Sequence, residues 1–286
     1  MGEPAGVGGE IALLAWARRR ALNLPTFFLI DDPHRLEALA RRLRLKVKIA
    51  PIAHPREAVA AFARGVPVLG LRLAKTVEPG HPSPDNAPSV LESLDKAVAA
   101  AEAGAASAVV TNPIHKETLY RAGFRHPGHT EYLAERTGAV AAVMMLVVPG
   151  LRVVPVTVHL ALKDALTSLT AEKIVACGGI AALALRQDFG VARPRLAVAA
   201  VNPHAGENGT LGRDEIDVIA PAVERLRAMG IAATGPQPAD TLFHGAARRR
   251  YDAALCMYHD QALVPLKTLD FYGGVNVTLG LPIVRT

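Results

Sequence analysis

The chain has 286 residues, of which 50% are apolar and 5% aromatic, and it carries a formal net charge of +6. This length suits one large or two ordinary α/β domains, and the apolar share allows a sizeable core. The basic excess fits solvated helix faces or an anionic small ligand. We expect no nucleic-acid partner, because no basic stripe interleaved with aromatics and no nucleic-acid motif occurs.

Targeting and membrane signals are weak in this sequence. Residues 1–10 lack the basic start and apolar segment of a signal peptide. The longest apolar stretch, 139–158, is interrupted by Pro, Gly and Arg, and therefore predicts two buried strands rather than a membrane span. Cys177 and Cys256 are too few for a disulfide scaffold or a zinc knuckle. We expect a cytoplasmic protein with no membrane partner.

The chain opens with the glycine-rich segment GEPAGVGGE, residues 2–10, which leads into a helix expected to start near Glu10. No Gly-Lys-Ser/Thr follows, so the segment is not a Walker A loop. No strand precedes it, so it also differs from a dinucleotide-binding fingerprint. By itself the segment is a weak signal for phosphate binding.

Apolar runs of strand length then alternate with longer segments of helical period. We expect strands at 26–31, 107–113, 152–159, 194–204 and 251–259, and helices at 33–44, 89–104, 160–169, 171–190, 213–230 and 241–250. This alternation is typical of βαβ units and predicts an α/β protein with a mainly parallel sheet covered by helices. Residues 75–88 are rich in Pro, Gly and Asn and predict a loop that could cross between two lobes.

The segment GHTEYLAERTG, residues 128–138, predicts a helix start. Thr130 can cap a helix that opens at Glu131. The free N–H groups of that helix would then make an anion site. The alternative is an ordinary N-cap without a ligand.

Polar side chains follow several of the expected strands. They are Thr111, Asn112, His115 and Lys116; His159; Asn202, His204 and Glu207; and His259, Asp260 and Gln261. In an open parallel sheet, ligands bind outside the carboxyl ends of the strands. These side chains could therefore converge although they are far apart in the sequence.

Three histidines occupy comparable strand-end positions: His159, His204 and His259. Neutral imidazole is the commonest protein metal ligand. Three imidazoles with an open fourth position make a catalytic zinc-type arrangement. The alternative is that each is a hydrogen-bonded cap or core residue, because the spacing matches no local zinc motif. We expect the remaining histidines singled out to be structural or solvated, namely His34, His54, His81, His126 and His244.

The C-terminal stretch, residues 266–286, carries Lys267, Asn276 and Arg285 within largely apolar sequence. Lys and Arg commonly hold phosphate and carboxylate groups, and Arg can do so with two parallel hydrogen bonds. The alternative is scattered surface charge.

Six motifs together resemble the 4-hydroxythreonine-4-phosphate dehydrogenase family of vitamin B6 biosynthesis. They are GEPAGVGGE, GHTEYLAERTG, VTVHLALKD, VNPHAGENGTLGRDE, MYHDQALVPLKTLDF and GVNVTLGLPIVRT. The motifs follow the family's order and span nearly the whole chain. The resemblance implies two α/β/α lobes with a central cleft, as in isocitrate and isopropylmalate dehydrogenases, with residues 1–286 forming one two-lobed catalytic unit. It also implies a homodimer with active sites at the subunit interface.

The resemblance further implies an NAD-dependent enzyme that requires a divalent metal. The enzyme would oxidise 4-phosphooxy-L-threonine (4-hydroxythreonine 4-phosphate), and the product would lose CO2 to give 3-amino-2-oxopropyl phosphate. The matching metal ligands are His159, His204 and His259, one of them from the partner subunit. The matching substrate contacts are His129, Thr130, Lys267, Asn276 and Arg285.

The sequence does not identify the metal ion, the catalytic base or the dinucleotide-binding residues uniquely. Three nitrogen ligands favour zinc or cobalt, although substrate oxygens could admit magnesium. Lys116, Lys163 and Asp260 are the base candidates, and Asp260 could instead orient a histidine ligand. The sequence assigns no residue to the dinucleotide.

The chain departs from the family pattern in three respects. Glu3 replaces the usual Asp of the first motif, and His115 replaces Asn, which could add a cation or a stray metal ligand. Both ends are short, because the family has a strand before the first motif and a segment beginning Asp-His-Gly-Thr-Ala after the last. We therefore expect both family termini to be missing.

Two other functions are compatible with the same residues. A paralogue could oxidise a phosphorylated four-carbon sugar acid, such as threonate or erythronate phosphate. A non-redox protein, either an acyl-phosphate transferase on a similar fold or an inactive metal-binding relative, is the second alternative.

Overall fold

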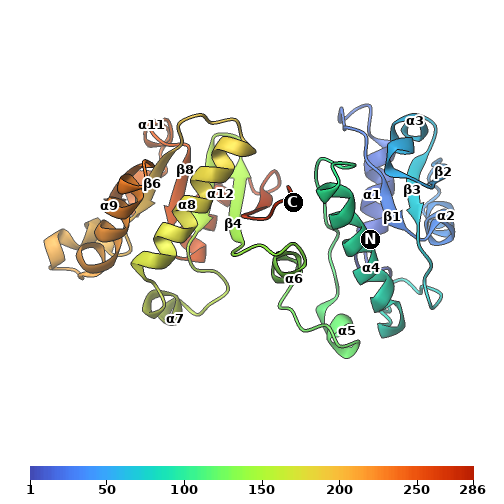
Figure 1. Cartoon of the computed structure of the whole chain (residues 1–286), viewed down its shortest axis with the longest axis horizontal. Coiled ribbons are helices and arrows are strands. Elements are labelled where there is room, and N and C mark those ends of the chain that lie inside the picture. The colour runs from blue at the N-terminus through green and yellow to red at the C-terminus, as the bar shows by residue number, and fades with distance from the viewer. The chain divides into compact units, whose positions relative to one another are not determined.

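The computed structural model describes residues 1–286 and divides them into two compact units, each with its own sheet and core (Figure 1). The first unit comprises Met1–Gly138 and Arg285, and the second comprises Ala139–Val284 and Thr286. The expected loop at 75–88 lies inside the first unit, so it does not cross between the units.

The first unit contains a small parallel sheet. Its strands are β1 (Leu29–Asp31), β2 (Ile49–Ile52) and β3 (Val66–Gly70), in the order β1-β3-β2. Three helices pack with it: α1 (Gly8–Ala17), α2 (Pro33–Arg42) and α3 (Ala58–Phe62). Their shared core is built on Leu13, Leu36, Phe62, Val66 and Val68, and burial of these side chains holds the helices to the sheet.

Local signals start α2 directly after β1. Asp32 is the N-cap, and its Oδ1 accepts hydrogen bonds from the backbone N–H of His34 at 2.8 Å and of Arg35 at 3.2 Å. Pro33 occupies the first helical position, where its missing N–H costs nothing. The helix therefore begins as the sequence predicts.

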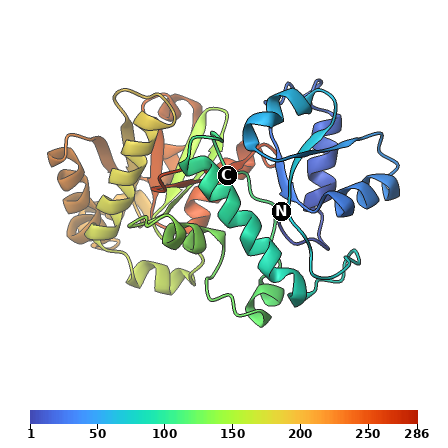
Figure 2. The same cartoon turned by 45° about the vertical axis from the view of Figure 1, so that its right-hand side comes forward.

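The rest of the first unit consists of α4 (Ala87–Glu102), α5 (Lys116–Arg121), α6 (His129–Arg136) and the short turns η1 (Pro55–Glu57) and η2 (Pro84–Asn86). Figure 2 shows α4 along its full length. The strand expected at 107–113 is wrong, because only Val109 pairs there, in an isolated bridge with Arg285. Without a continuous partner the segment cannot form a ladder, and Val110 is 78% exposed.

The second unit contains a six-stranded mixed sheet. Its strands are β4 (Val143–Val148), β5 (Leu151–Pro155), β6 (Arg195–Ala199), β7 (Ala232–Gln237), β8 (Ala253–Cys256) and β9 (Val275–Leu279), in the order β7-β6-β8-β5-β4-β9. The four strands from β7 to β5 are parallel, whereas β4 is antiparallel to both β5 and β9. The two buried strands expected within 139–158 are the β4–β5 hairpin.

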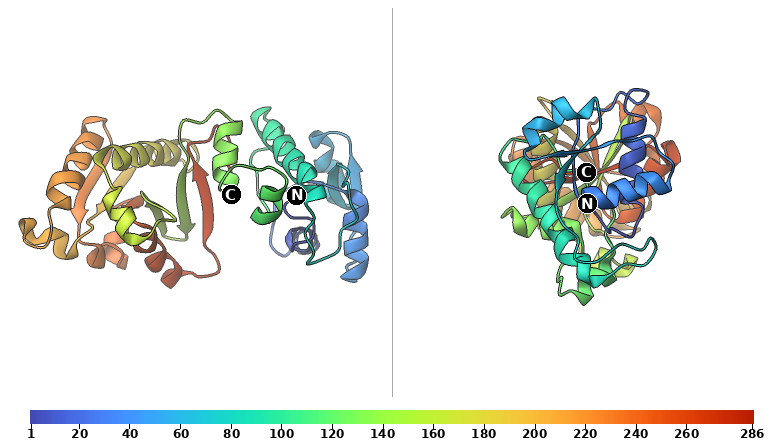
Figure 3. Two further views of the ribbon diagram at one scale, coloured as in Figure 1. Left: turned by 90° about the horizontal axis from the view of Figure 1, so that it is seen from below. Right: turned by 90° about the vertical axis from the view of Figure 1, so that its right-hand side faces the viewer.

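Helices cover both faces of this sheet (Figure 3). They are α7 (Leu162–Thr167), α8 (Ala171–Gln187), α9 (Ala220–Ala228), α10 (Ala239–Leu242), α11 (Gly245–Arg248) and α12 (His259–Leu269), with the short turns η3 (Pro203–Gly209) and η4 (Glu215–Ile219). Because strand side chains alternate, Leu196 and Val198 of β6 join the core of α8 and α9, whereas Ala197 and Ala199 join the core of α12.

The α/β class is therefore confirmed, and the likeness to isocitrate and isopropylmalate dehydrogenases stays a prediction. No helix is both long and apolar enough to cross a membrane.

Candidate functional site

Two of the strand-end histidines of the second unit lie side by side. His159 follows β5, and His259 opens α12 just after the neighbouring parallel strand β8. Their ring centroids are 5.8 Å apart with 46° between the ring planes. Both line a cavity of about 300 Å3 together with Thr157, Tyr258 and Asp260. The sheet edge thus brings two of the three expected imidazoles together.

Buried polar side chains fix the backbone beneath this pair. Thr157 Oγ1 donates to the carbonyl oxygen of Met257 at 2.7 Å. Gln261 Oε1 accepts from the N–H of Met257 at 2.6 Å, and its Nε2 donates to the carbonyl oxygen of Ala200 at 2.7 Å. The ends of β5, β6 and β8 are therefore cross-linked by hydrogen bonds that water does not reach, which makes the sheet edge rigid.

The neighbouring carboxylate sets the tautomer of His259. Its Nδ1 lies 2.7 Å from Asp260 Oδ1. A carboxylate accepts, so Nδ1 is the donor in this contact and Nε2 is the nitrogen left to face a metal. A histidine held by a carboxylate in this way is typical of metal ligands.

The backbone at His159 and His204 is left-handed, with φ of 52° at both residues. Non-glycine residues avoid this region, and such a conformation costs about 1–3 kcal/mol unless the surroundings impose it. Strain of this kind concentrates at functional sites, which supports a functional role for these two histidines.

His204 lies in an unusual turn after β6, where the five residues from His204 to Asn208 are all left-handed. Glu215, which is 3% exposed, holds the start of this turn. Its Oε1 accepts from the N–H groups of Val201 at 2.8 Å and Asn202 at 2.7 Å, and its Oε2 accepts from Asn202 Nδ2 at 2.9 Å. A Cβ at Gly206 would lie 2.7 Å from Glu215 Oε2, so only glycine fits there.

His204 does not join the His159–His259 pair within one chain. No group of three or more His, Cys, Asp or Glu side chains is close enough to hold a metal ion. A single chain therefore brings two of the predicted ligands together, and a ligand from a partner subunit stays a prediction.

The other expected contacts in the second unit are exposed. Lys267 lies in the last turn of α12, with its Nζ 5.5 Å from the ring centroid of Phe271. Asn276 lies on β9 opposite Leu146 of β4. Lys163 lies on α7 but does not line the cavity that holds the two imidazoles.

The first unit gathers His129 and Arg285 with Lys116. His129 Nε2 is buried and has no hydrogen-bond partner. Burial first, and then the charges of Arg285 and Lys116, lower the pKa of His129 from 6.5 to about 4. Arg285 is itself buried and donates to Thr111 Oγ1 at 2.9 Å. A neutral imidazole with a spare nitrogen beside two cations suits an anion such as a phosphate.

Thr130 and His115 have different local roles from those expected. Gly128 is the N-cap of α6, which begins at His129, so the prediction that Thr130 caps this helix is wrong. Gly128 has an extended backbone (φ −176°, ψ −165°), and the helix begins at the next residue. His115 is the N-cap of α5: its Nδ1 lies 2.6 Å from Thr118 Oγ1 and accepts from the N–H of Thr118.

Glu3 also acts locally. Its Oε1 accepts from the N–H of Ala5 at 3.0 Å, and its own N–H donates to the carbonyl oxygen of Pro113. The longer carboxylate therefore closes the turn of the first motif.

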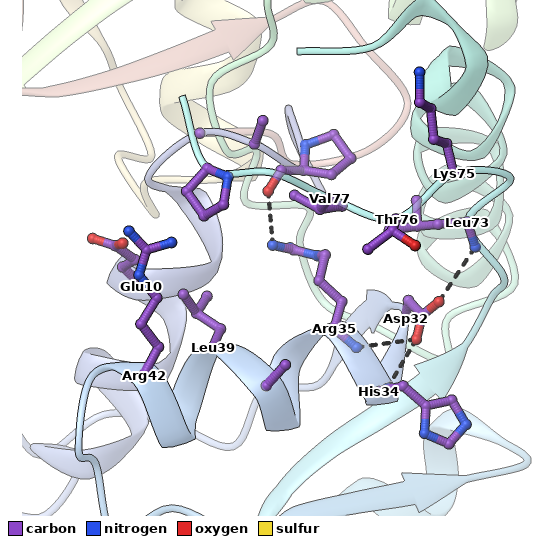
Figure 4. Close-up of a pocket in the computed structure, with 15 residues that line it drawn as sticks. Glu10, Asp32, His34, Arg35, Leu39, Arg42, Leu73, Lys75, Thr76 and Val77 are labelled. Atoms are coloured by element: carbon purple, nitrogen blue, oxygen red, sulfur yellow. Dashed lines mark hydrogen bonds between the residues drawn. The ribbon is translucent and has the colours of Figure 1, made fainter. Parts of the chain in front are cut away.

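A second cavity, of about 390 Å3, lies wholly within the first unit (Figure 4). Its lining includes Asp32, Arg35, Arg42, Lys75 and Thr76, none of which the sequence analysis assigned to a site. The missed signal was the pair Asp31–Asp32, which ends β1 just as polar residues end the strands of the second unit.

Fold and side chains together define an α/β protein that presents paired imidazoles at the carboxyl edge of an open sheet. Residues 23–286 match the family model described as "Pyridoxal phosphate biosynthetic protein PdxA". The chain belongs to this family, the 4-hydroxythreonine-4-phosphate dehydrogenases of pyridoxal phosphate biosynthesis.

The similar proteins cover the whole chain. A 4-hydroxythreonine-4-phosphate dehydrogenase of Caulobacter vibrioides is 54% identical over 100% of this chain and 86% of its own length. The enzyme of that name from Bradyrhizobium diazoefficiens is 53% identical with the same coverage. The crystal structure of the Klebsiella pneumoniae 4-hydroxythreonine-4-phosphate dehydrogenase superposes with a TM-score of 0.92 at 37% identity, covering 100% of this chain and 88% of that one. The predictions of this family and of an enzyme are confirmed.

Proposed function

We propose that the chain oxidises 4-phosphooxy-L-threonine with NAD and releases 3-amino-2-oxopropyl phosphate after decarboxylation, as a cytoplasmic, metal-dependent homodimer. The observation that carries the proposal is the His159–His259 pair at a rigid sheet edge, in a chain of this family. Membership of the family favours this substrate over threonate or erythronate phosphate and over acyl-phosphate transfer.

The donor set fits a divalent metal. His159 and His259 offer two nitrogen ligands in one cavity, and Asp260 orients the second of them. We assign the third nitrogen to His204 of a second copy of the chain, since no third ligand lies near the pair. Nitrogen donors favour zinc or cobalt, with magnesium the weaker candidate.

The apolar surface beside both histidine positions supports the homodimer. Leu160, Leu162 and Leu166 next to His159 are 51%, 56% and 39% exposed. Leu211 and Ile216, near the turn of His204, are 47% and 43% exposed. Apolar side chains that lie together on a surface are typical of a protein interface, and these residues are our candidates for it.

Each proposed group has a separate task in the reaction. A divalent ion would lower the pKa of the substrate hydroxyl and polarise the keto group that forms. NAD would accept the hydride. His129, Thr130, Lys267, Asn276 and Arg285 are the residues we propose to bind the phosphate and carboxylate groups. Asp260 already holds His259, which leaves Lys116 and Lys163 as the better base candidates.

The test is formation of NADH by the purified chain with 4-phosphooxy-L-threonine, NAD and added zinc, cobalt or magnesium ions. We expect turnover that stops when a chelator is added and returns with metal. Threonate and erythronate phosphate serve as competing substrates. A higher kcat/KM for either sugar acid would replace the proposed substrate, and acyl transfer without NADH formation would replace the reaction.

A further inference from the structure

One buried side chain of the second unit joins the backbone segments that lead to the predicted metal ligands. Gln261 is 7% exposed and is the third residue of α12, which begins at His259. Its Oε1 accepts from the N–H of Met257, which follows β8, and its Nε2 donates to the carbonyl oxygen of Ala200, which follows β6. Met257 and Ala200 are each 1% exposed, so solvent does not compete for these two hydrogen bonds.

The first hydrogen bond fixes how the chain enters α12. The N-cap residue Tyr258 gives this helix no side-chain cap. The Gln261 side chain instead turns back to the N–H of Met257, much as the third helical residue does in a capping box. His259 is the first residue of the helix, so the placement of its imidazole depends on this turn.

Met257 carries the same constraint to His159. Thr157, which is 4% exposed and lies two residues before His159, donates from its Oγ1 to the carbonyl oxygen of Met257 at 2.7 Å. Buried side chains therefore hold both polar backbone groups of Met257. This fixes the end of β8 against the end of β5, the two strands that precede the adjacent imidazoles of His259 and His159.

The second hydrogen bond of Gln261 acts on the chain that leads to His204. The carbonyl group of Ala200 and the N–H of Val201 belong to one planar peptide group. Gln261 Nε2 holds the carbonyl oxygen at 2.7 Å, and Glu215 Oε1 holds the N–H at 2.8 Å. A peptide group held at both polar atoms by buried side chains cannot rotate freely. The direction in which the chain leaves β6 toward His204 is therefore fixed.

We propose that Gln261 is a positioning residue for the metal site, with its amide setting the places of His259 and the His204 turn directly and of His159 through Met257. The inference rests on the proposed function, because it takes the three histidines as metal ligands. A primary amide suits this task because it offers an acceptor and a donor on one flat group.

Gln261→Met tests the role, because methionine has a similar length and makes neither hydrogen bond. The N–H of Met257 and the carbonyl of Ala200 then lose their partners, and the backbone must shift to satisfy them. We expect the Kd for zinc, measured by calorimetry on the whole chain, to rise about tenfold. Cobalt(II) bound in place of zinc should give altered visible absorption bands, because these bands report ligand geometry. The control is Gln187→Met, exposed at the end of α8, which should change neither readout.

Gln261→Glu is the milder variant and decides the question if Gln261→Met does not fold. The carboxylate still accepts from the N–H of Met257 but does not donate to the carbonyl oxygen of Ala200 when it is ionised. Losing one hydrogen bond should raise the Kd for zinc about threefold. A zinc Kd and cobalt bands equal to those of the original chain would contradict the inference.

The outcomes separate a positioning role from a structural one and from the proposed function. If both variants unfold at lower urea concentration but keep the original zinc Kd and cobalt bands, Gln261 supports only the fold and the inference is wrong. The proposed function then stands if the original chain oxidises 4-phosphooxy-L-threonine with metal. If Gln261→Met weakens zinc binding and alters the cobalt bands but the original chain oxidises no substrate of the family, the positioning role stands and the proposed function is wrong.

Discussion

The two sheets of this molecule use their carboxyl edges differently. In the second unit the edge presents the imidazoles of His159 and His259, and the groups that hold the backbone in place are uncharged donors and acceptors such as Thr157 and Gln261. In the first unit the edge is held by the Arg35–Asp31 ion pair, and the cavity beside it is lined by charged and apolar side chains.

The difference shows that the topology of a parallel sheet does not by itself determine which ligand its edge binds. Both edges collect polar side chains from segments distant in the sequence, as any open α/β sheet does. What such an edge can bind depends on the side chains that fill it. Nitrogen lone pairs suit a metal, whereas fixed charges suit a charged ligand.

Removing a ligand from the second edge should have the largest effect. His259→Ala is expected to lower zinc affinity by more than about a hundredfold, since loss of a group that merely supports a ligand already costs 10–100-fold. Isothermal calorimetry with zinc measures this directly. His244→Ala, at an exposed position on another loop, is the control. Equal zinc affinity in the two variants would remove His259 from the metal site.

Loss of the Glu215 carboxylate, which holds the turn of His204, should have the second-largest effect. Glu215→Ala leaves the N–H groups of Val201 and Asn202 without their acceptor and should weaken zinc binding about 10–100-fold. Glu215→Gln keeps one acceptor oxygen and should recover part of the affinity. Glu224→Ala, exposed on α9, is the control. A purely structural role for Glu215 would lower the unfolding midpoint and leave zinc affinity intact in the folded fraction.

The first unit should lose stability in acid because of His129. Its folded-state pKa of about 4 lies below the ordinary 6.5, so between these values the unfolded chain binds a proton that the folded chain does not. Stability therefore falls as pH drops through this window, by about 2 kcal/mol near pH 4.5. Urea unfolding followed by the fluorescence of Trp16, the only tryptophan, reports this.

His129→Gln should remove that part of the pH dependence, because glutamine does not titrate. His54→Gln, at an exposed loop position, should retain it. If His129→Gln and the original chain lose the same stability between pH 7 and pH 4.5, His129 is not the group that destabilises the fold in acid.

The smallest effect is expected at an exposed substrate contact. Lys267→Ala should raise the KM for 4-phosphooxy-L-threonine about tenfold with kcat unchanged, if the ammonium binds phosphate equally in the ground and transition states. Steady-state kinetics with Lys46→Ala as the exposed control measure this. A lower kcat at constant KM would show that Lys267 acts in the chemical step.

Several elements were predictable from the sequence for local reasons. The start of α2 follows from Asp32 and Pro33, and the β4–β5 hairpin follows from two apolar runs separated by Pro149 and Gly150. Strands β2, β3, β7 and β9 were not predicted: a proline stands within β2, β3 and β7, and polar residues alternate with apolar ones in β9. The strand expected at 107–113 failed because an apolar run forms a strand only where a neighbour pairs with it.

The strand-end histidines were recognisable because they interrupt apolar sequence. The family motifs were recognisable because the order of residues along the chain is enough to identify them. Which imidazoles meet was decided by the order of the strands: β5 and β8 are neighbours, so His159 and His259 lie 5.8 Å apart. The left-handed turn of His204, its support by Glu215, and the cavity beside Arg35 all depend on contacts between distant segments. Local propensity carries no information about such contacts, because hydrogen bonds and packing between segments exist only once the chain has folded.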